Sequence, residues 1–206
     1  MFTGIVTEVG KIARIENRGD RRVTISCAMD PERIAIGASI ACSGVCLTVV
    51  DRGGVAGDAW FAVDVSGETI SRTAPSQWHE GAAINLEPAL KMGDELGGHI
   101  VTGHVDAVGK IVAIGTEGDS RRVEIAAPQA LAPYIAAKGS ITVDGISLTV
   151  NDVADQPDGS VHFFLNIIPH TADVTTMGQR VPGDGVNLEI DVLARYLQRM
   201  ESLRNG

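Results

Sequence analysis

The sequence predicts an all-β chain of two similar halves followed by a C-terminal α-helix. Two similar segments of about 100 residues follow one another, which indicates an internal duplication. Short runs rich in Val and Ile alternate with polar residues and are separated by turn residues at intervals of about eight to twelve. No long amphipathic helix alternates with these runs, which argues against a doubly wound α/β fold. Each half is therefore expected to be an antiparallel barrel or sandwich.

The internal repeat defines the halves. Residues 101–111 match residues 2–12 at seven of eleven positions. Because the period is too long for a solenoid, each copy is expected to be a domain with its own core. The Gly97-Gly98 link sets the predicted boundaries at 1–97, 98–190 and, for the helix, 191–206. Two further pairs of segments match in the same order at offsets of 101 and 102: 39–49 with 140–150, and 81–87 with 183–189.

The first copy is predicted to contain six strands. β-Branched residues predominate in them, and turn-forming residues separate them. A single helical turn is expected at 30–34, and a short helix or wide loop at 68–73. The strands are predicted at 4–15, 22–27, 39–42, 45–50, 60–65 and 83–87.

The second copy follows the same pattern until Asp191, where the spacing of apolar residues changes from strand-like to helical. A helix of this length is marginal in isolation, so it needs a surface to pack on, and a neighbouring subunit is a natural candidate. Further strands are predicted at 123–126, 140–150, 161–168 and 185–190; the helical stripe comprises Val192, Leu193, Tyr196, Leu197, Met200 and Leu203.

Charge, apolar content and cysteine spacing argue against several classes of protein. The formal net charge is −9, and no cluster of Lys and Arg offers a nucleic-acid surface. The sequence shows neither a signal peptide nor an apolar stretch of membrane-spanning length, so a cytoplasmic protein is expected. The three cysteines fit a reducing compartment better than a disulfide framework. Cys42 and Cys46 lack a second ligand pair at metal-binding spacing, so no metal site is expected.

Four motifs make the chain recognisable. They are residues 1–6 (Met-Phe-Thr-Gly-Ile-Val), 97–104 (Gly-Gly-His-Ile-Val-Thr-Gly-His), 138–140 (Lys-Gly-Ser) and 144–149 (Asp-Gly-Ile-Ser-Leu-Thr). Together they closely resemble the riboflavin synthase family of the alpha-chain type, built from two lumazine-binding repeats. The resemblance covers essentially the whole chain.

This resemblance implies a specific fold and reaction. The fold would be two six-stranded Greek-key barrels, each binding lumazine, with a C-terminal trimerisation helix. The enzyme would dismutate two molecules of 6,7-dimethyl-8-ribityllumazine into riboflavin and 5-amino-6-(ribitylamino)uracil, without a metal or organic cofactor. Active sites would lie between subunits of a homotrimer; enclosure by a lumazine synthase shell is left open.

A lumazine ring is flat and carries carbonyls and nitrogens at its edge, so its pocket needs backbone edges and small hydroxyls on a rigid frame. Strand ends rich in Gly, Ser and Thr supply them in both copies. The first copy offers Gly4, Ile5, Val6, Cys46, Leu47, Thr48, Asp64, Val65, Ser66, Gly67, Glu68 and Thr69. The second offers Gly103, His104, Val105, Lys138, Ser147, Leu148, Thr149, Ile168, Pro169, His170, Thr171, Ala172 and Asp173, with Asp191 in a polar or interface role.

The two copies differ where chemistry needs a difference, because equal half-sites cannot assign one substrate as donor and the other as acceptor. Deprotonation of the 7-methyl group suits a His of near-neutral pKa and a hydroxyl that relays protons. From the resemblance, His104, Ser147 and Thr149 are expected around that methyl group, Cys46 and Ser39 at the acceptor, and Lys138 and Asp144 in support. His170 stands where the first copy has Glu68, which leaves the ribityl contacts of the second pocket open.

Structural interpretations stay open beside these roles. The glycines also suit turns, and Cys46 also suits a small buried position. His104 on its own would fit a hydrogen-bonded structural histidine, and only its motif favours catalysis. A rival function of another class is a non-catalytic lumazine or flavin carrier. Such carriers would be expected to lose catalytic residues from one copy, whereas both copies here contain candidate pocket residues.

Overall fold

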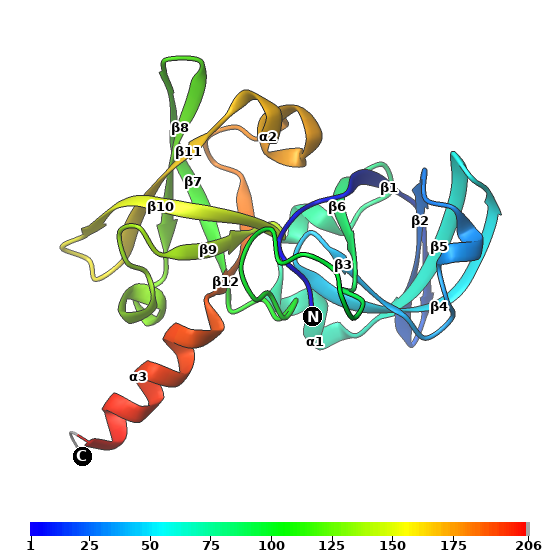
Figure 1. Cartoon of the computed structure of the whole chain (residues 1–206), viewed down its shortest axis with the longest axis horizontal. Coiled ribbons are helices and arrows are strands. Elements are labelled where there is room, and N and C mark those ends of the chain that lie inside the picture. The colour runs from blue at the N-terminus through cyan, green and yellow to red at the C-terminus, as the bar shows by residue number, and fades with distance from the viewer. Residues whose placement is uncertain (205–206) are drawn as a thin grey trace.

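The computed structural model of the chain describes residues 1–204 and shows two closed six-stranded antiparallel barrels in tandem, followed by a C-terminal helix (Figure 1). This confirms the predicted fold class. The first barrel has the strand order β1-β2-β5-β4-β3-β6, a Greek-key arrangement. Its strands are β1 (Glu8–Arg18), β2 (Asp20–Cys27), β3 (Ser39–Cys42), β4 (Val45–Val55), β5 (Asp58–Val65) and β6 (Ala83–Pro88).

The second barrel repeats this topology. Its order is β10-β11-β8-β7-β12-β9, which, followed around the closed barrel, is the order of the first. The duplication inferred from the sequence is therefore a duplication of the whole barrel. The strands are β7 (Ala107–Glu117), β8 (Ser120–Ala127), β9 (Ser140–Val143), β10 (Ile146–Asp155), β11 (Val161–Ile167) and β12 (Gly185–Ile190).

Short helices close the barrels. α1 and α2 occupy equivalent places after β5 and β11, and Pro169 at the start of α2 fits the first helical turn. The helix or loop predicted at 68–73 is thus a helix. The helical elements are η1 (Pro31–Arg33), α1 (Gly67–Arg72), η2 (Pro75–Gln77), η3 (Gln129–Tyr134), α2 (Pro169–Val174), η4 (Thr176–Gln179) and α3 (Val192–Arg204).

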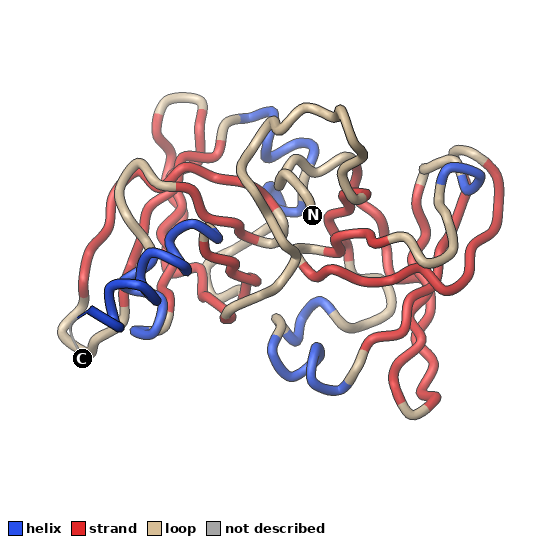
Figure 2. The backbone as a smooth tube through the Cα atoms, turned by 60° about the horizontal axis from the view of Figure 1, so that its bottom comes forward, coloured by secondary structure: helices blue, strands red, loops and turns tan. Residues whose placement is uncertain are grey.

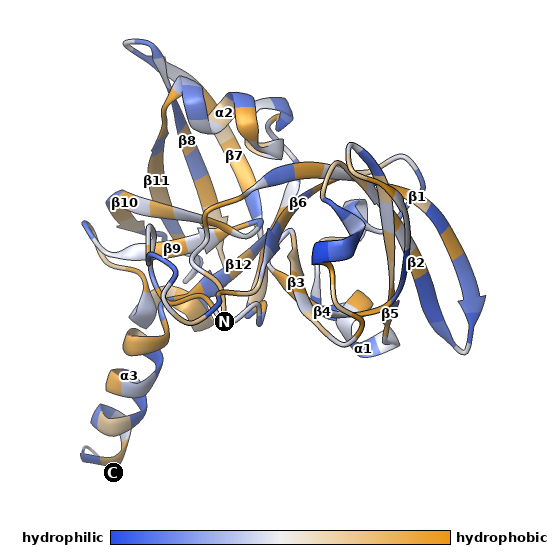
Figure 3. Ribbon diagram, turned by 45° about the vertical axis from the view of Figure 1, so that its right-hand side comes forward, coloured by the Kyte–Doolittle hydropathy of each residue, from blue (hydrophilic) through white to orange (hydrophobic). Residues whose placement is uncertain are grey.

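Each barrel has its own apolar core. Orange and blue residues alternate along the barrel strands (Figure 3), as expected where one face of a strand is buried. Phe61 in the first barrel and Phe163 in the second are fully buried at equivalent positions. The two cores are separate clusters, so each half folds around its own apolar interior.

The segments that precede β1 and β7 cross between the barrels. The N-terminus lies between the barrels, among the loops that join them (Figure 2). Phe2 is fully buried and forms an antiparallel bridge with Val101. Val6 packs against the core of the second barrel, and Val105 packs against the core of the first. The sequence predicted a first strand that begins at Gly4, but β1 begins at Glu8, because Gly4 and Val6 contact the opposite barrel.

The C-terminal helix α3 projects from the second barrel (Figure 1). Arg195 holds its base through an ion pair with Asp106 at 2.7 Å. No residue of the described part of α3 is buried, and residues 205–206 of the predicted helical segment lie outside the described residues. Within residues 1–204, no helix is long and apolar enough to cross a membrane. The apolar residues of the stripe are 63–66% exposed at Leu193, Tyr196, Leu197, Met200 and Leu203.

Candidate functional site

Two equivalent contacts define the candidate site regions. The N–H of Ser147 donates to the carbonyl of Gly4 at 2.8 Å, and the N–H of Cys46 donates to the carbonyl of Gly103 at 2.8 Å. Both glycines have positive φ, and a Cβ on either would lie 2.6 Å from the Cβ of its partner. Only glycine fits this approach, so the glycines of the two Thr-Gly motifs are needed for close contact between the barrels.

Buried carboxylates fix these crossing segments. Glu87 accepts hydrogen bonds from the N–H and hydroxyl of Thr3 and from the N–H of Gly4. Glu189 does the same for Thr102 and Gly103 in the other copy. Burial raises the pKa of the Glu87 carboxyl, and the donors from Thr3 oppose that rise. The repeated Asn-Leu-Glu segment is thus an anchor for the crossing chain.

The crossing corrects how the sequence grouped the pocket segments. The sequence placed residues 4–6 with 46–48, and 103–105 with 147–149, because each pair belongs to one copy. The structure instead brings residues 4–6 to Ser147 and residues 103–105 to Cys46. The candidate ligand-binding face of either barrel therefore lies beside a segment of the other repeat.

His99, which the sequence argument gave no role, is the histidine at Ser147. Its Nδ1 lies 2.7 Å from the Ser147 hydroxyl, and its Nε2 lies 3.2 Å from the Thr142 hydroxyl. Burial lowers the pKa of His99, and the charge of Asp191 opposes that shift. A buried neutral imidazole bonded to a hydroxyl can accept its proton.

Comparison of the two copies missed His99 because its counterpart would precede Met1. Its neighbour Gly98 is held so tightly that a Cβ would lie 2.1 Å from the carbonyl of Thr3. Gly98 therefore allows the chain to lie against β10, so that His99 reaches Ser147. This glycine was the local sequence signal for His99.

His104 occupies a different place from the one predicted. Its N–H donates to Glu189 at 3.1 Å, and its side chain is exposed beside the contact of Gly103 with Cys46. Within one chain, His104 thus belongs with Cys46 and not with Ser147. This follows because the chain crosses between the barrels just before His104. The expectation that His104 and Ser147 act on the same methyl group, in a site between subunits, stays a prediction.

Cys46 and Ser39 lie on the outer face of the first barrel. Ala41 pairs with Cys46 and Ser39 with Thr48, so the same face carries a thiol and two hydroxyls. Ser39 also lines a cavity of about 380 Å³ that is largely apolar. Cys42 points into the core, where burial raises the pKa of its thiol far above the usual value. Cys46, which is partly exposed, is the thiol available to a ligand on this face.

Asp144 is not placed to touch a substrate. Its side chain is 1% exposed, one oxygen accepts the N–H of Asn187, and the other pairs with Arg180 at 2.6 Å. Burial raises the pKa of Asp144, and Arg180 opposes the rise. The resemblance gave Asp144 a role in support of the catalytic residues, and the structure buries it in the β9–β10 turn, three residues before Ser147.

The backbone of Lys138 is strained. Its φ is +67°, whereas the equivalent residue of the first copy is Gly37 with φ +85°. Both N–H groups make the same bond, to Val150 and Val49 respectively. A non-glycine residue in this region is uncommon, and such strain is often retained where the side chain has a function.

The helices α1 and α2 form the remaining candidate walls. Ser66 and Ile168 cap them at equivalent positions, so residues 64–69 correspond to 166–171. The range 168–173 taken from the sequence is shifted by two, and it omitted Asn166, whose Oδ1 is buried without a partner. Asp64, at the position of Asn166, forms a two-bonded ion pair with Arg22.

Glu68 and His170 differ as the sequence indicates. Glu68 pairs with Arg72 at 2.8 Å on α1, and both side chains are mostly exposed. His170 is exposed in the first turn of α2. Among residues 1–204, no three side chains of His, Cys, Asp or Glu converge as a metal site requires. The chemistry available at these regions is that of imidazole, hydroxyl, thiol and amine groups.

The comparisons with known proteins agree with the duplication. The model of the lumazine binding domain matches this chain twice, at residues 3–89 and 102–191. Riboflavin synthase of Brucella abortus is 50% identical over 205 residues, which span 97% of this chain and 98% of that protein. The chain belongs to the riboflavin synthase family. The resemblance drawn from its motifs is thereby confirmed.

Other members of the riboflavin synthase family match over the same length. The enzyme of Mycobacterium tuberculosis (strain H37Rv) is 46% identical and that of Bacillus subtilis (strain 168) is 34% identical; each match covers 97% of this chain, and 98% and 89% of the relatives. Among solved structures, LumP complexed with 6,7-dimethyl-8-(1'-D-ribityl) lumazine has a TM-score of 0.77 and 26% identity. That match covers 92% of this chain and 99% of LumP.

Proposed function

We propose that this chain is a riboflavin synthase that dismutates two molecules of 6,7-dimethyl-8-ribityllumazine into riboflavin and 5-amino-6-(ribitylamino)uracil. One observation carries the proposal: the chain has two equivalent contact regions with different reactive groups, His99 with Ser147 on one and Cys46 beside His104 on the other. Two bound copies of one substrate then meet different chemistry, as a dismutation requires.

Ser147 and His99 are the groups we assign to the donor of the four-carbon unit. Deprotonation of the 7-methyl group transfers a proton toward the Ser147 hydroxyl, which passes its own proton to the neutral His99 Nδ1 at 2.7 Å. General-base catalysis of this kind contributes about 10²- to 10⁴-fold. Thr149 continues the same outer face of β10 and is exposed.

Cys46, Ser39 and Thr48 are the groups we assign to the acceptor lumazine. The four-carbon unit is transferred to the acceptor, so the face that receives it must be open, and Thr48 is exposed on it. Holding the two lumazines against each other converts a bimolecular reaction into an effectively unimolecular one. The two walls α1 and α2, together with Lys138, are assigned to the ribityl chains and ring edges.

The active assembly is proposed to be a homotrimer with sites between subunits. The exposed apolar stripe of α3 supports self-association, because isolated helices of this length need a packing surface. The proposed domains are those predicted from the sequence: a lumazine-binding barrel at 1–97, a second at 98–190 and the oligomerisation helix at 191–206. A cytoplasmic location is supported by the free thiols of Cys27, Cys42 and Cys46. Association with a lumazine synthase shell stays a prediction from the family resemblance.

A second candidate function is a non-catalytic lumazine or flavin carrier. LumP, whose fold matches at a TM-score of 0.77, was solved with a lumazine, with riboflavin and with flavin mononucleotide. The retained His99–Ser147 pair together with Cys46 favours catalysis.

The deciding experiment incubates the purified protein with 6,7-dimethyl-8-ribityllumazine and no added cofactor. Steady formation of riboflavin, at one product per two lumazines consumed, supports the synthase. Tight binding without conversion establishes the carrier and overturns the proton-transfer roles of His99 and Ser147.

A further inference from the structure

The wall of the second pocket is one compact unit. We call residues 168–180, which contain α2 and η4, the α2 wall. Gly178 approaches α2 so closely that a Cβ would lie 2.1 Å from the carbonyl of Ala172, and the Thr175 hydroxyl donates to the carbonyl of Thr171 at 2.6 Å. Because η4 and α2 are packed together in this way, a contact that fixes η4 also fixes α2.

Arg121 fixes η4 to the second barrel. From the start of β8 its guanidinium donates to the carbonyls of Met177 at 3.0 Å, Gly178 at 2.6 Å and Arg180 at 3.1 Å. In the first copy, the corresponding helical turn η2 is held by an uncharged side chain instead: Gln77 donates to the carbonyl of Cys42.

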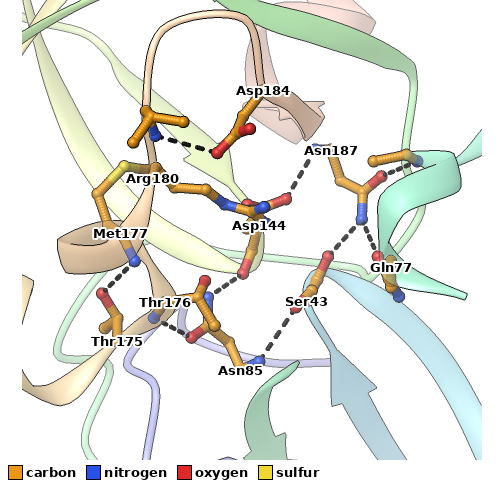
Figure 4. Close-up of polar contacts among 12 residues, drawn as sticks. Ser43, Gln77, Asn85, Asp144, Thr175, Thr176, Met177, Arg180, Asp184 and Asn187 are labelled. Carbon is orange, nitrogen blue, oxygen red and sulfur yellow. Dashed lines mark hydrogen bonds and ion pairs between the residues drawn. The ribbon is translucent and has the colours of Figure 1, made fainter. Parts of the chain in front are cut away.

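Arg180 ties the end of the α2 wall to the turn that precedes Ser147. Figure 4 shows its side chain extending from this wall to Asp144, with which it pairs at 2.6 Å. A neutral link runs parallel to the ion pair: Asn85 accepts the N–H of Thr176 at 2.8 Å and donates to the carbonyl of Asp144 at 2.8 Å. The turn and the wall are thus joined twice.

The neutral link is present in both copies, whereas the ion pair is not. Asn187 makes the equivalent link between Ala74 and Ser43 in the first copy. There the Ser43 hydroxyl accepts the N–H of Asn85, as Asp144 accepts that of Asn187. A hydroxyl therefore suffices for the turn. A buried ion pair carries a desolvation cost and is weak evidence for stability, so its presence in one copy needs another explanation.

We propose that Arg121 and Arg180 are positioning residues for the second lumazine pocket, holding the α2 wall in its ligand-binding conformation before substrate arrives. The inference rests on the proposed function for the identity of the ligand. A wall that is already ordered does not have to be ordered by the substrate, which lowers the cost of binding. If the wall is released, the apparent affinity falls in proportion to the fraction of molecules with an ordered wall.

Two variants release the wall without leaving a buried charge alone. The first is Arg121→Met. The second is the double variant Asp144→Ser with Arg180→Met, which copies the arrangement of Ser43. The matched control is Arg21→Met, at the position of the first barrel equivalent to Arg121. Arg180→Lys keeps the charge and is the conservative variant.

Hydrogen exchange tests the wall in the absence of lumazine. The reporters are the amide protons of Ala172, Thr176 and Arg180, which all donate within or from the wall. Both releasing variants are expected to speed their exchange at least tenfold, with the amides of α1 unchanged. Arg21→Met and Arg180→Lys are expected to behave like the parent protein. Unchanged exchange in both releasing variants would overturn the proposal.

Steady-state kinetics tests the link to the pocket. The releasing variants are expected to raise KM for 6,7-dimethyl-8-ribityllumazine about tenfold while kcat stays within threefold, because saturating substrate orders the wall again. Arg180→Lys is expected to keep the KM of the parent protein. A fall in kcat at unchanged KM, or a lower thermal midpoint with unchanged KM in the active fraction, would contradict a positioning role. If the parent protein forms no riboflavin, the proposed function fails, and the exchange result still decides whether the arginines order the wall.

Discussion

The Ser147 hydroxyl lies 2.7 Å from Nδ1 of His99, a residue 48 positions earlier in the chain. This contact exists because residues 97–99 pass over the outer face of β9 and β10, where Gly98 leaves no room for a side chain. The pair joins a proton-relaying hydroxyl to an imidazole that is neutral near pH 7, and it suits the removal of a proton from carbon.

Replacing either member of this pair is expected to remove turnover while preserving substrate binding. Ser147→Ala and His99→Gln should each lower kcat by about 10²- to 10⁴-fold, the usual contribution of a general base. The measurements are riboflavin formation and lumazine titration by fluorescence. His162→Gln is the matched control, since His162 pairs with Glu124 on the outer surface and is expected to leave turnover unchanged. Normal turnover in Ser147→Ala would remove the pair from the mechanism.

Burial of His99 predicts a pH-dependent stability. Its pKa is lowered in the folded chain from an ordinary value of 6.5, mainly by desolvation. Well above pH 6.5 the imidazole is neutral in both states and contributes nothing to the pH dependence. As the pH falls through 6.5, the unfolded chain gains a proton that the folded chain resists, so the free energy of unfolding decreases.

Chemical denaturation at several pH values between 5 and 8 measures this slope. His99→Gln is expected to have a shallower slope below pH 6.5 than the parent protein, with the other four histidines serving as a common background. Parallel slopes in the two proteins would contradict a neutral, buried His99.

Lys138→Gly separates ligand binding from stability. The glycine relieves a φ of +67°, so the folded chain is expected to gain about 1 kcal/mol. Loss of the ammonium group should weaken lumazine binding about tenfold, as expected for a hydrogen bond to a charged group. Lys138→Ala is the matched control, because it removes the amine and keeps the strain. It should show the same loss of affinity without the gain in stability; equal affinity in all three proteins would exclude Lys138 from the pocket.

Truncation after Asp191 is expected to convert the oligomer to monomers. It removes α3, which contributes no buried residue within the chain, so both barrels should remain folded. Sedimentation velocity measures the assembly, and circular dichroism checks the barrels. An oligomer of unchanged subunit number would show that the assembly is held elsewhere.

The sequence alone determined the duplication and the all-β class, and four of its motifs indicated the family by resemblance. The first two features are local and periodic: alternation of apolar and polar residues follows from strand geometry, and turn residues mark the strand ends. The glycines at 4 and 103 and the Ser-Leu-Thr of β10 were found in the same way, because each is part of a motif that occurs in both copies.

Tertiary structure decided which residues meet. The segments before β1 and β7 bind the opposite barrel, so Gly4 contacts Ser147 and Gly103 contacts Cys46. From the order of the sequence, each of these segments was assigned to the barrel of its own copy. The sequence could not show that each contacts the opposite barrel, because the alternation of apolar and polar residues in the strands is the same in both arrangements. Packing between the barrels also places His99 at Ser147 and His104 beside Cys46. Asp144 is buried against Arg180. Periodicity records which face of a strand is buried, whereas the partner of that face is set by packing between the two barrels.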